Sequence, residues 1–181
     1  VSTVTVFASD SPMAYTDGSY QFILNADNTA TITKYTGNEH RITIPAQVTQ
    51  DAQTYPVTKI GDRVFCNYKY FLTSVQIPDT VTEIGSNAFR ACSALTSIVI
   101  PNQVKLVGSY AFTSCSLNHI GWGSSVEKIG YGAFEKNKFV EMKIPQQIKY
   151  IGREAFSCND YLQEISVPNG CEVDWAAFGW C

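Results

Sequence analysis

The chain has 181 residues, of which 45% are hydrophobic and 16% are charged, and its formal net charge is −3. A chain of this length and apolar content can bury one sizeable core, which excludes an intrinsically disordered protein. The acidic charge balance disfavours nucleic acid as a partner, and no apolar run is long enough to predict insertion into a membrane.

The first eight residues, Val1–Ala8, have two interpretations. Val4 and Val6 alternate with threonines, a pattern typical of a β-strand, and we expect this strand to belong to a cap. The tripeptide Val-Phe-Ala also resembles the cleavage site of a secretory signal peptide, of which this segment would be the end. We favour the strand.

A β-hairpin is predicted next, because the strand-like runs 20–24 and 29–35 flank Asn25–Asn28, a segment rich in turn-forming residues. From Ile42 onwards the apolar residues take a spacing that later segments repeat, with a loop near 50–56 interrupting the first copy. We therefore predict an N-terminal β cap over residues 1–40. Residues 41–181 are predicted to form a solenoid of about five repeats plus partial coils, continuous with the cap.

The repeat has two halves, and the first is the motif I-G-x-x-A-F. It is complete at Ile84–Phe89 and recurs every 22 to 24 residues, with Val64 replacing Ala in the first copy and Asp174 replacing Gly in the last. The copies begin at Ile60, Ile84, Val107, Ile129, Ile151 and Val173. We expect the Gly to allow a turn and the A-F segment to form a short helical or 3₁₀ turn that points both side chains into the core.

The second half is L-x-x-I-x-I-P-x-x-V, which is complete at Leu95–Val104. Alternation of its apolar residues predicts a short strand with one face inward, and Pro ends that strand because it cannot donate a ladder hydrogen bond. The third copy departs from the pattern, with Trp122 and Gly123 in the Ile and Pro positions. Together the halves predict a strand-dominated, right-handed α/β solenoid with parallel strands, in which stacked units share one core.

A further position recurs three residues after each core Phe. It is occupied by Cys92, Cys115, Asn137, Asn159 and Cys181. Stacked coils bring Cys92 and Cys115 within range of a disulfide, but equivalent side chains on stacked coils run parallel, so we favour free buried thiols. A Cys171–Cys181 bridge across the last coil is a second alternative.

Two aromatic groups also have alternative interpretations. Near the first repeat, Tyr68, Tyr70 and Phe71 form either a contact site or local packing against the cap, and we favour packing. In the last repeat, either Trp175 and its aromatic neighbours Phe178 and Trp180 close the end of the core, or the chain is a piece of a longer array.

The complete pattern at Ile84–Pro101, I-G-x-x-A-F-x-x-C-x-x-L-x-x-I-x-I-P, resembles the BspA-like leucine-rich repeat. The resemblance covers residues 41–181 and implies a solenoid fold. It also implies a protein that is secreted or displayed on the cell surface, with adhesion as the activity. The expected partners are a host or matrix protein or another cell-surface molecule.

The candidate partner-binding surface is the outward face of the I-x-I-P strands. Its candidate residues are Gln76, Val99, His119, Glu141, Lys143 and Glu164. Gly121 beside His119 predicts a shallow spot on this face, and the alternative is that the face is only solvated. We predict no catalytic, cofactor or metal site, because neither histidine stands in a nucleophile or metal-ligand motif.

From the sequence alone we predict a non-enzymatic extracellular or cell-surface adhesion module that recognises a protein or glycan through the solenoid. The alternative is a structural spacer or scaffold within a larger surface protein. A third class, a carbohydrate-docking accessory domain, would need an aromatic platform, for which Trp175 and Trp180 are the candidates.

Overall fold

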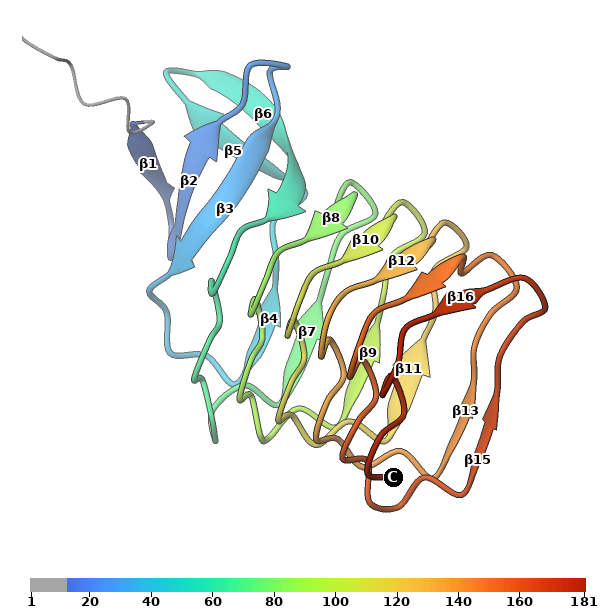
Figure 1. Cartoon of the computed structure of the whole chain (residues 1–181). Helices are drawn as coiled ribbons and strands as arrows, with labels where there is room; N and C mark the ends of the chain where they lie inside the picture. The colour runs from blue at the N-terminus through green and yellow to red at the C-terminus, as the bar shows by residue number, and fades with distance from the viewer. Residues whose placement is uncertain (1–12) are drawn as a thin grey trace, which may run out of the picture.

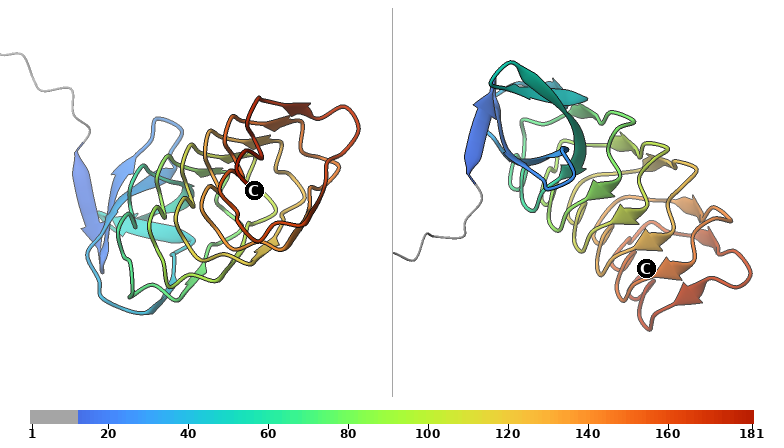
Figure 2. Two further views of the ribbon diagram at one scale, coloured as in Figure 1. Left: turned by 60° about the horizontal axis from the view of Figure 1, so that its bottom comes forward. Right: turned by 90° about the horizontal axis from the view of Figure 1, so that it is seen from above.

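The computed structural model describes residues 13–181, so the strand expected at Val1–Ala8 lies outside the described residues. Within this range the chain forms sixteen strands and no α- or 3₁₀-helix (Figure 1). A solenoid of stacked coils leads away from a block of longer strands at the N-terminal side (Figure 2). The strand-dominated solenoid predicted from the repeats is therefore confirmed.

The N-terminal block consists of three antiparallel strands and a separate hairpin. Strands β1 (Ala14–Asp17), β2 (Tyr20–Leu24) and β3 (Ala30–Tyr35) are antiparallel, which includes the hairpin predicted at this place. The segment predicted as a loop is a second hairpin, of β5 (Gln47–Gln50) and β6 (Gln53–Ile60). Its two turn residues, Asp51 and Ala52, have φ of 50° and 61°, as a two-residue type I′ turn requires.

The solenoid carries two rows of strands on different sides. The first row begins on β3 and β6 and continues through two-residue strands in parallel register. These strands are β8 (Glu83–Ile84), β10 (Leu106–Val107), β12 (Lys128–Ile129), β14 (Tyr150–Ile151) and β16 (Glu172–Val173). Every neighbouring pair in this row is hydrogen-bonded, so the sheet runs the length of the molecule.

The second row consists of the predicted I-x-I-P strands, and we call it the three-residue row. Its strands are β4 (Arg41–Thr43), β7 (Ser74–Gln76), β9 (Ser97–Val99), β11 (His119–Gly121), β13 (Glu141–Lys143) and β15 (Glu164–Ser166). This row is broken into three parallel pairs: β4–β7, β9–β11 and β13–β15.

A column of phenylalanine rings occupies the core between the rows. The rings belong to Phe65, Phe89, Phe112, Phe134, Phe156 and Phe178. Successive centroids lie 4.9–5.6 Å apart with nearly parallel planes, and the first five rings are fully buried. The register predicted from the A-F motif therefore places each Phe in the core.

The A-F segments are hydrogen-bonded turns, unlike the helical or 3₁₀ turns expected. Each turn contains two left-handed residues, as at Tyr110 (φ 58°) and Ser114 (φ 56°). The amide of each of the first five core Phe residues donates to the Ala carbonyl of the next coil at 2.7–2.8 Å, as from Phe112 to Ala133. Because these amides bond between coils, they are not available for the i−4 bonds of a helix.

The repeat glycine is needed for close packing of the backbones. Gly108 does not have the positive φ that would require glycine in a turn, but a Cβ there would lie 2.7 Å from backbone atoms of Gly85 and Ile84. Its amide donates to the Ile84 carbonyl at 2.8 Å. The reason for this glycine is therefore contact between coils and not the turn geometry expected from the sequence.

The recurring Cys/Asn position bonds to the previous coil. Cys115 Sγ lies 3.2 Å from the Phe89 carbonyl oxygen, and Asn137 Nδ2 donates to the equivalent Phe112 carbonyl at 2.9 Å. All six cysteines are free in the structure, as we favoured for Cys92 and Cys115, and the Cys171–Cys181 alternative is not formed.

The last repeat differs from one of its expected arrangements. Phe178 stacks on Phe156 and continues the core column, but Trp175 and Trp180 are 67% and 85% exposed. Their positions fall in the outward part of the turn, so they do not close the core. Near the first repeat, Tyr68 packs on the N-terminal block, while Tyr70 and Phe71 are exposed.

Candidate functional site

The outward face of the three-residue row has the alternation expected from the sequence. The middle residue of each strand points inward, as Ile98, Ile120 and Met142 do, and all three are buried. The flanking residues are exposed, except Gly121, which is half-buried. Val99 is 68% exposed, and Gly121 lies directly beside it, since a Cβ on Gly121 would lie 3.2 Å from Val99 Cγ2.

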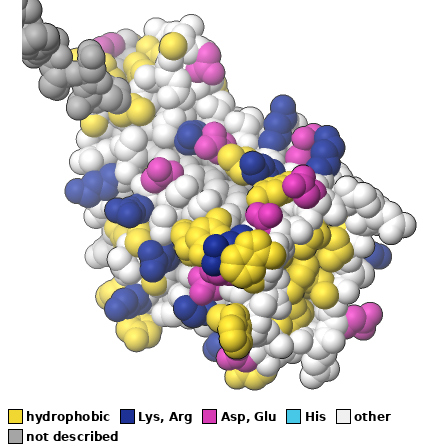
Figure 3. Space-filling view, in the orientation of Figure 1, with side chains coloured by type: hydrophobic (Ala, Val, Ile, Leu, Met, Phe, Trp, Pro, Cys, Tyr) yellow, Lys and Arg dark blue, Asp and Glu magenta, His cyan; other side chains and the backbone are white. Residues whose placement is uncertain are grey.

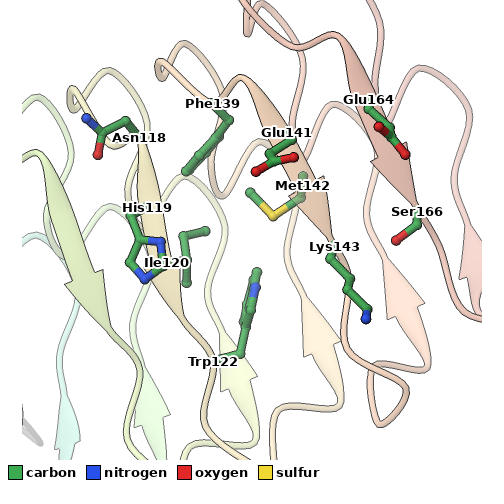
Figure 4. Close-up of a pocket in the computed structure, with 10 residues that line it drawn as sticks. All are labelled: Asn118, His119, Ile120, Trp122, Phe139, Glu141, Met142, Lys143, Glu164 and Ser166. Carbon is green, nitrogen blue, oxygen red and sulfur yellow. The ribbon is translucent and has the colours of Figure 1, made fainter.

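An opening of about 440 Å³ interrupts this face between β11 and β13 (Figure 4). Among residues 13–181, no backbone hydrogen bond joins these two strands, although each is paired with its other neighbour. The two coils are hydrogen-bonded again on either side of the opening. Lys138 N donates to Leu117 O at 2.8 Å, and Gln147 Nε2 donates to Gly123 O at 2.9 Å. The opening is thus a local parting of two coils.

The third repeat departs from the pattern at the edge of the opening. Trp122 is the larger replacement for an inward Ile, and its ring packs edge-to-face on Phe134 at 5.6 Å. Gly123 replaces Pro, and a Cβ at this position would lie 2.1 Å from the Pro101 carbonyl oxygen. Gly123 therefore allows the chain to lie very close to the preceding coil, and Trp122 adds bulk on the side of the following coil.

The opening has an apolar floor and a polar rim. Ile120, Phe139 and Met142 form the buried part, with Trp122 half-buried beside them. In Figure 4, His119 and Trp122 lie on the β11 side, and Glu141 and Met142 extend from β13. The polar lining residues are Asn118, His119, Glu141, Lys143, Glu164 and Ser166.

The structure brings four of the six candidate residues together. His119, Glu141, Lys143 and Glu164 line the opening, whereas Gln76 and Val99 lie on earlier strands and take no part in it. That any of these residues binds a partner remains a prediction.

Sequence reasoning missed the floor of the opening. The repeat pattern places Ile120 and Met142 at inward strand positions and Phe139 at the position of Leu95, so it predicts all three as ordinary core residues. The signal that could have found the opening is the loss of Ile-Pro at Trp122–Gly123, because it is the one strand end in the five copies without Pro.

A second cavity, of about 400 Å³, lies between the N-terminal block and the first coil. Its phenol groups are already engaged, with Tyr20 Oη donating to the Thr43 carbonyl at 3.1 Å and Tyr35 Oη donating to Glu39. Burial, helped by the Glu39 charge, raises the pKa of Tyr20 to about 12. Because both phenol groups already have hydrogen-bond partners within the junction, we favour the first opening as the site.

The exposed tryptophan of the last repeat also has a partner within the chain. The Arg153 guanidinium lies 3.8 Å from the centroid of the Trp175 ring, so one ring face is covered by a cation. Figure 3 shows hydrophobic groups mixed with Lys, Arg, Asp and Glu on the side of the molecule that carries the two-residue strands. The guanidinium leaves less of the Trp175 ring for a sugar to stack on, whereas Trp180 is 85% exposed.

The described part of the chain has neither a cluster of metal ligands nor a membrane-spanning helix. Residues 13–181 contain no group of three or more His, Cys, Asp or Glu residues placed to hold a metal ion. Over the same range, no helix has the length and hydropathy needed to cross a bilayer.

Comparison with known proteins connects this fold to one family. Residues 58–181 match the model of the BspA type leucine-rich repeat region in six copies. A leucine-rich cell surface protein of Faecalibacterium prausnitzii is 47% identical over 87% of the chain, with a TM-score of 0.52. A leucine-rich repeat protein of T. pallidum is 28% identical over 86% of the chain, with a TM-score of 0.78. No curated protein gives a match.

The chain is shorter than these structural relatives. It spans 55% of the F. prausnitzii protein and 72% of the T. pallidum protein. A leucine-rich repeat protein of Bacteroides ovatus, 30% identical over 91% of the chain with a TM-score of 0.71, is covered over 42% of its own length. The structural similarity therefore extends beyond residues 58–181 of this chain but covers only part of each relative.

Proposed function

The chain belongs to the family of BspA-type leucine-rich repeat proteins, and from this membership we propose that it is a non-enzymatic binding module that acts outside the cell or at its surface. The observation that carries the proposal is the exposed face of the three-residue row, interrupted by the opening between β11 and β13. Solenoids offer extended faces of this kind to their partners. The cell surface protein of F. prausnitzii supports the proposed location.

The partner that we propose is a protein of the host, of the matrix or of another cell surface. The rim residues provide charges of both signs and hydrogen-bonding groups, while the floor provides apolar contact. This combination of an apolar centre and a polar rim is typical of protein recognition sites. A glycan is the competing partner within the same proposed function.

The test is a binding screen of the whole 181-residue chain against immobilised matrix proteins, mucins and glycans. We expect at least one protein to bind, and the variant H119A/E141Q/K143Q to lose most of that binding. The matched control is E127Q/K128Q/K149Q, which changes exposed residues on and beside the two-residue strands and should bind normally.

Two outcomes would count against this proposal. Equal binding by the two variants would remove the site from the three-residue row. The absence of binding to every immobilised molecule would favour a spacer or scaffold role.

A further inference from the structure

The parting between β11 and β13 exposes two strand edges to the same opening. β11 pairs with β9 through the register Ile120 to Ile98, and β13 pairs with β15 through the register Met142 to Ile165. Each strand therefore has one edge that is hydrogen-bonded to a neighbour. Its other edge faces the opening, and within residues 13–181 no backbone hydrogen bond joins β11 to β13. An unpaired edge of this kind is a template for an added extended segment.

The floor of the opening is apolar, so it suits an apolar side chain better than water. Ile120, Phe139 and Met142 are 8%, 1% and 7% exposed, so only a small part of each contributes to the bottom of the opening. The volume of about 440 Å³ lies within the range of ~300–1,000 Å³ that is usual for ligand sites. The thioether of Met142 adapts to differently shaped apolar groups.

The rim carries an unbalanced pair of carboxylates. Glu141 and Glu164 stand directly opposite each other in the register of β13 and β15, and both are exposed. Neither forms an ion pair within residues 13–181, although Lys143 lies on the same strand as Glu141. Like charges placed directly opposite on neighbouring strands repel each other, so a cation from a partner would relieve this repulsion.

We propose that the opening between β11 and β13 binds an extended peptide segment of a partner protein, with an apolar side chain on the Ile120–Met142 floor and a basic side chain between Glu141 and Glu164. This inference rests on the proposed function, since it specifies the partner of the same site. The free edges fit an extended backbone, the floor fits the apolar anchor, and the carboxylates fit the cation.

A sugar fits these features less well. The Phe139 ring is buried, and the Trp122 ring is held edge-to-face on Phe134, so the floor does not present a broad exposed ring. The unpaired carboxylates favour a cation, which peptides supply through lysine and arginine.

The probe is a phage-displayed library of random linear heptapeptides, selected on the whole chain. We expect the enriched sequences to share an apolar residue next to, or two positions from, Lys or Arg. The best sequence is then synthesised, and its dissociation constant is measured by fluorescence anisotropy. We expect E141Q/E164Q to weaken this peptide about tenfold, the effect of one lost charge-assisted hydrogen bond.

Blocking the opening provides a second, independent arm. Ser166 is an exposed lining residue, so S166W should fold normally and abolish binding of the peptide. The control S74W places the same side chain at an exposed position on β7, away from the opening, and should bind like the unmodified chain. Circular dichroism and the melting temperature of both variants verify folding.

The other possible outcomes either overturn the inference or separate it from the proposed function. Enrichment of acidic peptides, no enrichment, or peptide binding that survives S166W would overturn the inference. So would a glycan, found on an array probed in parallel, whose binding S166W abolishes. Suppose instead that a matrix protein binds the chain, and that both S166W and E141Q/E164Q still bind that protein normally. The proposed function then stands, and this inference alone fails.

Discussion

At the scale of single residues, the recurring Cys/Asn position shows how two chemistries can satisfy one structural need. Cys92 and Cys115 sit where later coils carry Asn137 and Asn159, and all four contact the Phe carbonyl of the preceding coil. A neutral thiol can donate to that carbonyl, whereas a thiolate cannot. The position therefore requires the protonated form of each cysteine.

This requirement predicts a loss of stability at alkaline pH. Burial raises the pKa of Cys115 from its ordinary value of 9.0 to about 12, and it raises the pKa of Cys92 as well. An acid whose pKa is raised by folding contributes stability that is complete below about pH 9 and is lost as pH rises towards 12. In urea unfolding at pH 8 to 11, we expect C115N to lose less free energy of unfolding than the unmodified chain.

Iodoacetamide provides a check that does not depend on unfolding. At pH 8.5, we expect Cys115 to remain unmodified while the exposed Cys181 is alkylated, because reaction needs an accessible thiolate. Mass spectrometry of the digested protein measures both sites. Equal alkylation rates would mean that Cys115 is not buried as described.

At the scale of elements, the phenylalanine column places one buried ring in nearly every turn. Phe112 is fully buried and stacks between Phe89 and Phe134 at 5.1 and 5.4 Å. We expect F112A to lower the free energy of unfolding by about 3–5 kcal/mol, since it leaves a cavity between two coils. The control F71A removes a ring that is 56% exposed and should cost little. A melting temperature of F112A equal to that of F71A would contradict the assigned register.

The repeat made the I-x-I-P strands and the core Phe predictable, but neither the two-residue strands nor the conformation of the turns. Tyr110 and Lys136 have φ of 58° and 56°, although neither residue favours the left-handed region. Their conformation follows from hydrogen bonds to the next coil, as from Tyr110 N to Tyr131 O at 2.7 Å. A pattern within one repeat contains no information about these bonds, so the sequence suggested a helical turn.

The candidate site was predictable to the extent that strand alternation determines which residues face outward. His119, Glu141, Lys143 and Glu164 were found in this way. The opening itself depends on the spacing between two coils, to which Trp122 and Gly123 contribute through contacts with other repeats. That spacing cannot be derived from the residues of one strand.

At the scale of the whole molecule, two features make opposite predictions about cooperativity. The sheet that contains the first strand row is hydrogen-bonded without interruption from β1 to β16, which favours unfolding as one unit. Coils otherwise contact only their neighbours, and the three-residue row is broken twice, which favours local opening. Removing a core side chain from a middle coil distinguishes cooperative unfolding of the whole chain from local opening.

We expect F112A to increase hydrogen exchange locally, because the ring it removes stacks on the rings of the two adjacent coils. Protection should fall most across residues 83–137 and least in β2 and β3, whose pairing lies three coils away in the N-terminal block. Exchange followed by mass spectrometry under native conditions measures both regions in one experiment, with F71A as the reference. An equal fall in β2 and β3 would show that the continuous sheet couples the whole chain, and the breaks in the three-residue row would then have no energetic consequence.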